Sequence, residues 1–168
     1  MKKIFHLPIA LLLLIAASCS TQNKSAEESL SGTTDSTGVK RGIYATMSIS
    51  DTIRMGDSVM LKFTVYNPTD SAQKFLKWQT PFEPLLSKYL DIKDDKGEEA
   101  QYVGAMAKRM MPPPADAYIT VAPGDSLIAN VNLLKGYALS KAGSYTIAYN
   151  SEGVSNLKVD KSLSFIYK

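Results

Sequence analysis

The amino-acid sequence predicts an all-β fold, an antiparallel β-sandwich of about seven to nine short strands. Residues 59–66 alternate apolar and polar side chains with a period of two, which is typical of a strand with one buried face. Weaker runs of the same kind recur along the chain, separated by turn sequences such as Asn-Pro-Thr-Asp at 67–70 and Ala-Pro-Gly-Asp at 122–125. No segment carries the long apolar stripe of an amphipathic helix.

The expected strands follow these runs in chain order. They are 43–50, 59–66, 72–79, 89–93, 98–102, 118–121, 127–133, 145–150 and 162–167. The Asp-Asp-Lys-Gly sequence at 94–97 predicts a tight turn between two of them. A Gly-Asp-Ser turn occurs twice, at 56–58 and 124–126, and each copy leads into an alternating strand. We therefore expect the strands that follow these turns to be equivalent members of two facing sheets.

Two aromatic residues favour the immunoglobulin-like version of this sandwich. Tyr145 begins a late strand two residues after Gly143, as in a tyrosine corner, where the phenol donates a hydrogen bond to upstream backbone. Trp78, on an early strand, is expected to fill the core position that such sandwiches often give to Trp. The usual disulfide between the sheets cannot form, because residues 42–168 contain no cysteine.

The amino terminus predicts a bacterial lipoprotein. Two lysines, an apolar stretch at 9–17 and small residues directly before Cys19 are typical of an export signal at 1–18. The apolar stretch is shorter than the roughly 20 residues that a membrane-spanning helix needs. One interpretation is that Cys19 carries lipid as the first residue of the exported protein; the other is an ordinary signal with a chance thiol nearby. We favour lipidation, because secreted proteins rarely keep one unpaired thiol.

The remaining chain divides into a tether and one domain. Residues 19–41 comprise the lipidated cysteine and a segment rich in Ser, Thr and Gly, which lacks the apolar residues of a packed core. Residues 42–168 are long enough to form one β-sandwich domain. We expect a lipid-anchored protein of the bacterial cell envelope, at the outer membrane, on either its periplasmic or its surface face.

Charge and composition exclude several classes of function. Removal of residues 1–18 takes away two lysines and the only histidine, His6, and leaves 17 basic residues against 16 acidic ones. No long basic run remains, so we expect no nucleic-acid partner. Without histidine the exported chain cannot form a Ser-His-Asp triad, a Cys-His pair or an HExxH zinc site. We therefore expect no enzyme, no catalytic residue, no metal site and no cofactor.

Acidic residues gather at one expected turn, and two interpretations fit them. A solvated hairpin turn beside lysines is the simpler one; calcium binding is the other, although the spacing is not that of an EF-hand. The residues are Asp91, Asp94, Asp95, Glu98 and Glu99.

The most unusual segment is 104–117, which is long for a loop between strands. Its three consecutive prolines favour a stiff, extended arm, and its methionines offer adaptable apolar contacts. Three interpretations fit: the loop covers one end of the sandwich, it docks a protein partner, or Met106, Met110 and Met111 bind copper(I) through their thioethers. In the second case the partner-binding residues are Lys108, Arg109, Met110, Met111 and Pro112.

Several of these residues occur in one order that resembles a known family. They are the Lys-Trp-Gln-Thr-Pro sequence at 77–81, Glu83, Tyr102, Lys108-Arg109, Tyr118, the Val-Ala-Pro-Gly sequence at 121–124, and residues 139–145. This order is similar to the amino-terminal, immunoglobulin-like pro-region of bacterial deuterolysin-like (peptidyl-Lys) zinc metalloendopeptidases, over residues 58–149. We expect the chain to lack the catalytic domain of that family, with its HExxH helix, so no catalytic residue carries over.

The resemblance implies a protein-binding role. In the family the pro-region assists folding of the protease and keeps it inactive, so we expect a membrane-anchored module that binds a protein partner, with a protease as the first candidate. A structural or spacer subunit of an envelope complex is the alternative. Catalysis through carboxylates or a Ser-Lys pair is a remote third class.

Overall fold

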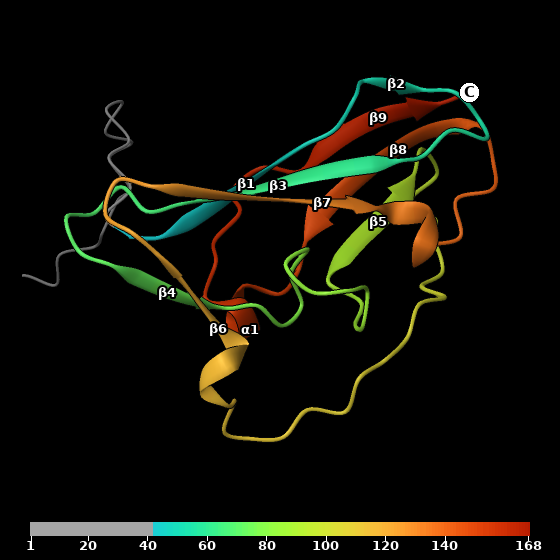
Figure 1. Cartoon of the computed structure of the whole chain (residues 1–168). Helices are drawn as coiled ribbons and strands as arrows, with labels where there is room; N and C mark the ends of the chain where they lie inside the picture. Colours follow the sequence, from blue (N-terminus) through green and yellow to red (C-terminus); the bar gives the residue numbers. More distant parts are fainter. Residues whose placement is uncertain (1–41) are drawn as a thin grey trace, which may run out of the picture. The chain divides into compact units, whose positions relative to one another are not determined.

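The computed structural model describes residues 42–168 (Figure 1). The predicted signal at 1–18, Cys19 and the tether at 19–41 lie outside the described residues. The predicted all-β class is confirmed, because strands dominate and the helices are short: α1 (Glu152–Ser155) and two 3-10 turns, η1 (Ala115–Ala117) and η2 (Leu133–Lys135). The strands are β1 (Tyr44–Ser48), β2 (Thr52–Ile53), β3 (Met60–Tyr66), β4 (Gln73–Leu76), β5 (Leu90–Asp94), β6 (Tyr118–Val121), β7 (Ser126–Asn132), β8 (Gly143–Tyr149) and β9 (Leu163–Tyr167).

The strands form two main sheets and a short ribbon. One sheet has the antiparallel order β1-β3-β7, and the other has the order β2-β9-β8-β5, in which only β2 and β9 are parallel. The core lies between them: Leu61 and Phe63 of β3 are fully buried with Ile92 of β5 and Ile147 of β8. The alternation at 59–66 that predicted β3 therefore directs one row of its side chains toward the opposite sheet.

The repeated Gly-Asp-Ser turn has a different consequence from the one expected. It precedes β3 and β7, and these strands are antiparallel neighbours in one sheet rather than members of facing sheets. Gly56 and Gly124 both adopt positive φ, 95° and 70°, a conformation that glycine enters without steric cost. The repeated sequence therefore specifies two similar turns. Which strands pair with each other is determined by tertiary packing.

A buried asparagine controls how this sheet continues into the ribbon of β4 and β6. The side-chain amide of Asn67 donates hydrogen bonds to the carbonyl oxygens of Ser71, Val121 and Ala122, at 2.8 to 3.0 Å. Its backbone N–H donates to the Asp125 carbonyl at 2.9 Å. Asn67 therefore ties together the two loops at which the β3–β7 pair gives way to the β4–β6 pair (Figure 1).

The expected strand at 98–102 is not formed. Ala100 donates to the Ile92 carbonyl, but the chain then leaves β5, and Val103 donates to the Gly136 carbonyl instead. Single bridges at Glu99 and Tyr102 remain where a continuous ladder was predicted. Among the elements that the sequence did not indicate, β2 and α1 are only two and four residues long, too short for a periodic pattern.

Tyr145 makes the hydrogen bond that a tyrosine corner requires. Its phenol donates to the Lys141 carbonyl at 2.9 Å, and its ring stacks on Phe165 with centroids 5.5 Å apart. The residue is buried within the main core. It therefore joins the loop before β8 to the packing between β8 and β9.

Within residues 42–168, no helix is long and apolar enough to cross a membrane.

Candidate functional site

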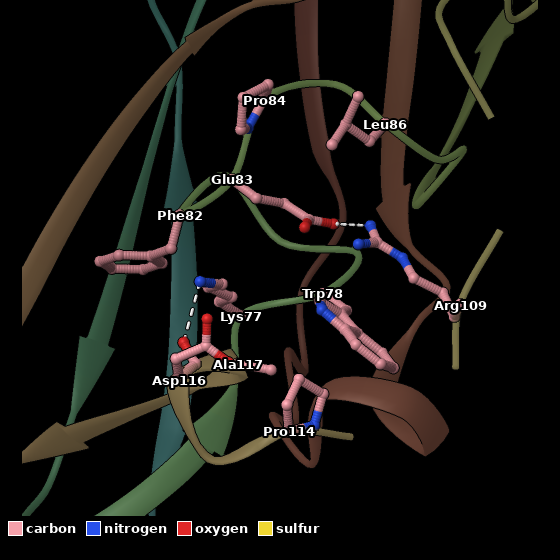
Figure 2. A pocket seen from close by; sticks show the side chains of 10 residues that line it. All are labelled: Lys77, Trp78, Phe82, Glu83, Pro84, Leu86, Arg109, Pro114, Asp116 and Ala117. Atoms are coloured by element: carbon pink, nitrogen blue, oxygen red, sulfur yellow. Dashed lines mark hydrogen bonds and ion pairs between the residues drawn. The ribbon is translucent and has the colours of Figure 1, made fainter. Parts of the chain in front are cut away.

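The loop at 104–117, which we call the Met-Pro loop, packs on the segment at 77–88 (Figure 2). The first part of the loop is held by a backbone hydrogen bond and by the side chain of one tyrosine. The phenol of Tyr102 donates to the carbonyl oxygens of Leu85 and Ala105, both at 2.9 Å, and Ala107 N–H donates to the Leu86 carbonyl at 2.7 Å. The loop therefore starts from a fixed position on the domain.

Arg109 fixes the middle of the Met-Pro loop. Its Nη2 lies 2.5 Å from Oε1 of Glu83, and its guanidinium lies over the ring of Trp78, 4.8 Å from the centroid. The same Glu83 oxygen accepts the N–H of Gln79 at 2.9 Å, and Gln79 has a positive φ of 57°. Glu83 is 5% exposed in its side chain, so this ion pair is shielded from water on its acidic side. A charge-assisted pair of this kind orients both partners closely.

The end of the loop is held by Lys77. Its Nζ donates to the Asp116 carbonyl, and its backbone N–H donates to the Ala117 carbonyl, both at 2.9 Å. Figure 2 shows Lys77 reaching toward Asp116 while Trp78 lies between Arg109 and Pro114. Trp78 is buried, as expected of a core residue, but it lies in a turn after β4 and in a small cluster with Leu76 and Ala117, outside the main core.

The predicted partner-binding residues therefore fall into two groups. Arg109 is directed into the domain, where it holds the loop rather than reaching a partner. Lys108 and Pro112 are exposed. Met110 and Met111 are 83% and 77% exposed, and Met106, farther up the loop, is 71% exposed. Large apolar side chains this exposed, on a loop anchored at both ends, are typical of a surface that contacts another protein.

A surface depression of about 370 Å³ lies directly beside the anchored part of the loop. Apolar and charged groups share its wall, and its lining residues are Lys77, Trp78, Phe82, Glu83, Pro84, Leu86, Arg109, Pro114, Asp116 and Ala117. Met110 and Met111 follow directly after Arg109, which lines this hollow. The loop thus combines exposed apolar side chains with a recess that could take one side chain of a partner.

The partly buried Tyr149 supports the backbone of the segment at 77–88. Tyr149 donates a hydrogen bond to the Gln79 carbonyl at 3.0 Å and is joined to Ser155 of α1 at 2.7 Å. Burial raises the pKa of Tyr149 to about 12, although the bond to Ser155 opposes the shift. Both backbone polar groups of Gln79 are therefore held: its N–H by Glu83 and its carbonyl by Tyr149.

The acidic turn has internal partners. Lys88 forms ion pairs with Glu99 and, at 3.1 Å, with Asp91. Partial burial alone would raise the pKa of Asp91, but hydrogen bonds from Asn150 and Lys88 outweigh it and lower the pKa. Asp94 accepts the N–H groups of Lys96 and Glu98, as a turn residue does. Within the described part of the chain, no three His, Cys, Asp or Glu side chains gather as metal ligands.

Sequence reasoning found the loop but missed the function of its anchors. Glu83 and Lys77 entered only through the family resemblance, and Gln79 and Tyr149 were not singled out as site residues. The order Trp78, Glu83, Arg109 was visible, but nothing in the spacing says that residues 26 positions apart form an ion pair.

The geometry defines an immunoglobulin-like sandwich that presents one anchored loop and an adjacent hollow. A sequence model of the immunoglobulin-like domain family matches residues 46–152, which is more than half of the chain, and the chain belongs to this family. No curated protein matches significantly.

One similar solved structure is the alkylpurine DNA glycosylase AlkC of Pseudomonas fluorescens, bound to DNA containing an abasic site analog. The identity is 13% and the TM-score 0.39; the match covers 76% of this chain but only 30% of the glycosylase chain.

Proposed function

We propose that the chain is a non-catalytic lipoprotein of the bacterial envelope, anchored through lipid on Cys19, whose immunoglobulin-like domain binds a protein partner with the Met-Pro loop. The observation that carries the proposal is the contrast within this loop. Arg109 is fixed internally on Glu83 and Trp78, while Met110 and Met111 are held outward. An anchored loop loses little conformational entropy on binding, which favours affinity.

A protease is the partner class we favour. The support is the resemblance of residues 58–149 to the pro-region of deuterolysin-like metalloendopeptidases, in which this kind of domain contacts the enzyme. Met106, Met110 and Met111 offer apolar contact, and Lys108 offers one cation to an acidic partner surface. A structural or spacer subunit of an envelope complex is the alternative, and it predicts assembly that does not depend on this loop.

The binding proposal is tested by capture from envelope extract with the full chain. In one variant Met110→Ser and Met111→Ser are combined with Lys108→Ala; in the matched control Met55→Ser and Met60→Ser are combined with Lys96→Ala. Met55 and Met60 are also exposed, but they belong to the turn before β3 and to β3 itself rather than to the loop. We expect the loop variant to lose a defined protein that wild type and control retain, with at least about a tenfold lower yield. Equal capture by all three would contradict the proposal.

Two further measurements test its finer parts. If the captured protein is a protease, adding the wild-type chain should slow its cleavage of a peptide, and the loop variant should not. Labelling cells with an alkyne fatty acid should mark the wild-type chain but not Cys19→Ser. If the wild-type chain were not labelled, the proposed lipid anchor would be wrong, while the proposed binding role of the loop would still stand.

A further inference from the structure

The outer edge of β7 is open. Leu133 N–H donates to the Val59 carbonyl and Asn67 N–H to the Asp125 carbonyl, which fixes the hydrogen-bonded pairs between β3 and β7. Because such pairs alternate in an antiparallel ladder, every second residue of β7 directs its backbone N–H and C=O away from β3. These residues are Ser126, Ile128, Asn130 and Asn132, and no backbone group in the described residues pairs with them.

The inward side chains of β7 also lack cover. Their partners on β3, including Leu61, Phe63 and Val65, are fully buried, whereas Leu127, Ala129 and Val131 are only half-buried. A strand added beside β7 would cover this apolar row and satisfy the open backbone groups together. Only an extended chain can do both.

This edge has none of the usual protection against another strand. Exposed edges are normally blunted by charged residues, proline or a short length. β7 has seven residues and contains no charge, no proline and no glycine. The edge strand of the other sheet, β5, carries Asp91, Lys93 and Asp94 and is partly covered by a bridge to Glu99.

We infer that β7 is the interface of a homodimer, in which two copies pair antiparallel about a two-fold axis at Ala129. In this register Ile128 faces Asn130 of the second copy and Ser126 faces Asn132, so all four open residues pair and up to about eight backbone hydrogen bonds form. On the inner face Leu127 meets Val131, and Ala129 meets its own copy. Because the strand is uncharged, no like charges oppose each other on it, and a continuous six-stranded sheet results.

The first test measures association of the full chain in detergent by sedimentation equilibrium. We expect a concentration-dependent dimer that Asn130→Pro weakens by at least about tenfold. The N–H of Asn130 points away from β3, so proline there removes a donor to the second copy and none within the domain. The thermal unfolding of the variant checks that it still folds. The inference would be overturned if the chain stayed monomeric up to about 100 μM, or if Asn130→Pro left the dissociation constant of the dimer unchanged.

Cysteine cross-linking decides the register even if the proline variant fails to fold. Residues opposite each other in a non-hydrogen-bonded pair have Cα atoms about 4.5 Å apart, within reach of a disulfide. Ala129→Cys should therefore give a disulfide-linked dimer under mild oxidation, and Asn130→Cys should cross-link much less. The wild-type chain, whose one cysteine is Cys19, serves as the background control. Equal cross-linking of the two variants would exclude this interface, whereas the loop variants described above should leave the dimer unchanged.

Discussion

Single residues differ in whether their burial is compensated by hydrogen bonds, and two core tyrosines show the contrast. The phenol oxygen of Tyr137 accepts the N–H of Leu90 at 3.0 Å. Tyr89 is equally buried, but within residues 42–168 its hydroxyl has no hydrogen-bond partner. A buried hydroxyl without a partner costs about 1–3 kcal/mol, so Tyr89 is a site where the core is not optimised for stability.

We therefore predict opposite effects of removing these two hydroxyls. Tyr89→Phe should leave the free energy of unfolding unchanged or raise it by about 1 kcal/mol, because an unpaired polar group disappears. Tyr137→Phe should lower it by about 1–2 kcal/mol, because the buried Leu90 N–H loses its acceptor. Urea titration of both variants followed by circular dichroism measures the difference. Equal destabilisation by the two substitutions would contradict this account.

At the scale of the element, the Met-Pro loop is held by hydrogen bonds and one ion pair to the domain rather than by its prolines. The sequence predicted stiffness from Pro112 to Pro114, yet the described contacts fix the loop through Tyr102, Arg109 and Lys77. Glu83 is nearly inaccessible to water, so losing its cation leaves a buried charge with one N–H donor. The loop should therefore loosen when Arg109 is changed.

The prediction for the loop compares a single and a double substitution. Arg109→Met keeps much of the side-chain volume but removes the cation. It should lower the free energy of unfolding by about 1–3 kcal/mol and speed cleavage after Lys108 by a lysine-specific protease about tenfold. Adding Glu83→Gln removes the stranded charge, so the double variant should regain part of the stability while its loop stays cleavable. A double variant as unstable as Arg109→Met would show that the charge is not the cause.

The elements also show how far sequence reasoning reaches. Period-two alternation located β3, and the Gly-x-Tyr pattern located the Tyr145 corner, because both are local signals. The failed strand at 98–102 and the shared sheet of β3 and β7 depend on which distant segment supplies the hydrogen bonds. In the candidate site the exposed methionines were predictable from loop length and composition. The inward orientation of Arg109 was not predictable. The residues around an arginine in a loop do not reveal whether its side chain faces solvent or pairs with a distant residue such as Glu83.

For the whole molecule, buried phenols make stability depend on alkaline pH. Burial raises the pKa of Tyr137 and Tyr149 to about 12, and it raises the pKa of Tyr89 further. Below about pH 10 these phenols are protonated in the folded and unfolded states alike, so they add no pH dependence. Above that value the unfolded chain loses these protons first, and stability falls as pH rises.

We predict a steep loss of stability between about pH 10 and pH 12. Each of the three phenols lowers the free energy of unfolding by about 1.4 kcal/mol per pH unit in this range, so together they cost about 4 kcal/mol per unit. Urea titrations at several pH values measure the slope, and tyrosinate absorbance should rise together with the loss of β-structure. Tyr137→Phe should make the slope shallower, since one proton held by burial is removed. If the free energy of unfolding stayed constant up to about pH 11.5, the phenols would be ionising in the folded protein as they do in the unfolded chain. Water would then have to reach them, which contradicts a tightly closed core between the two sheets.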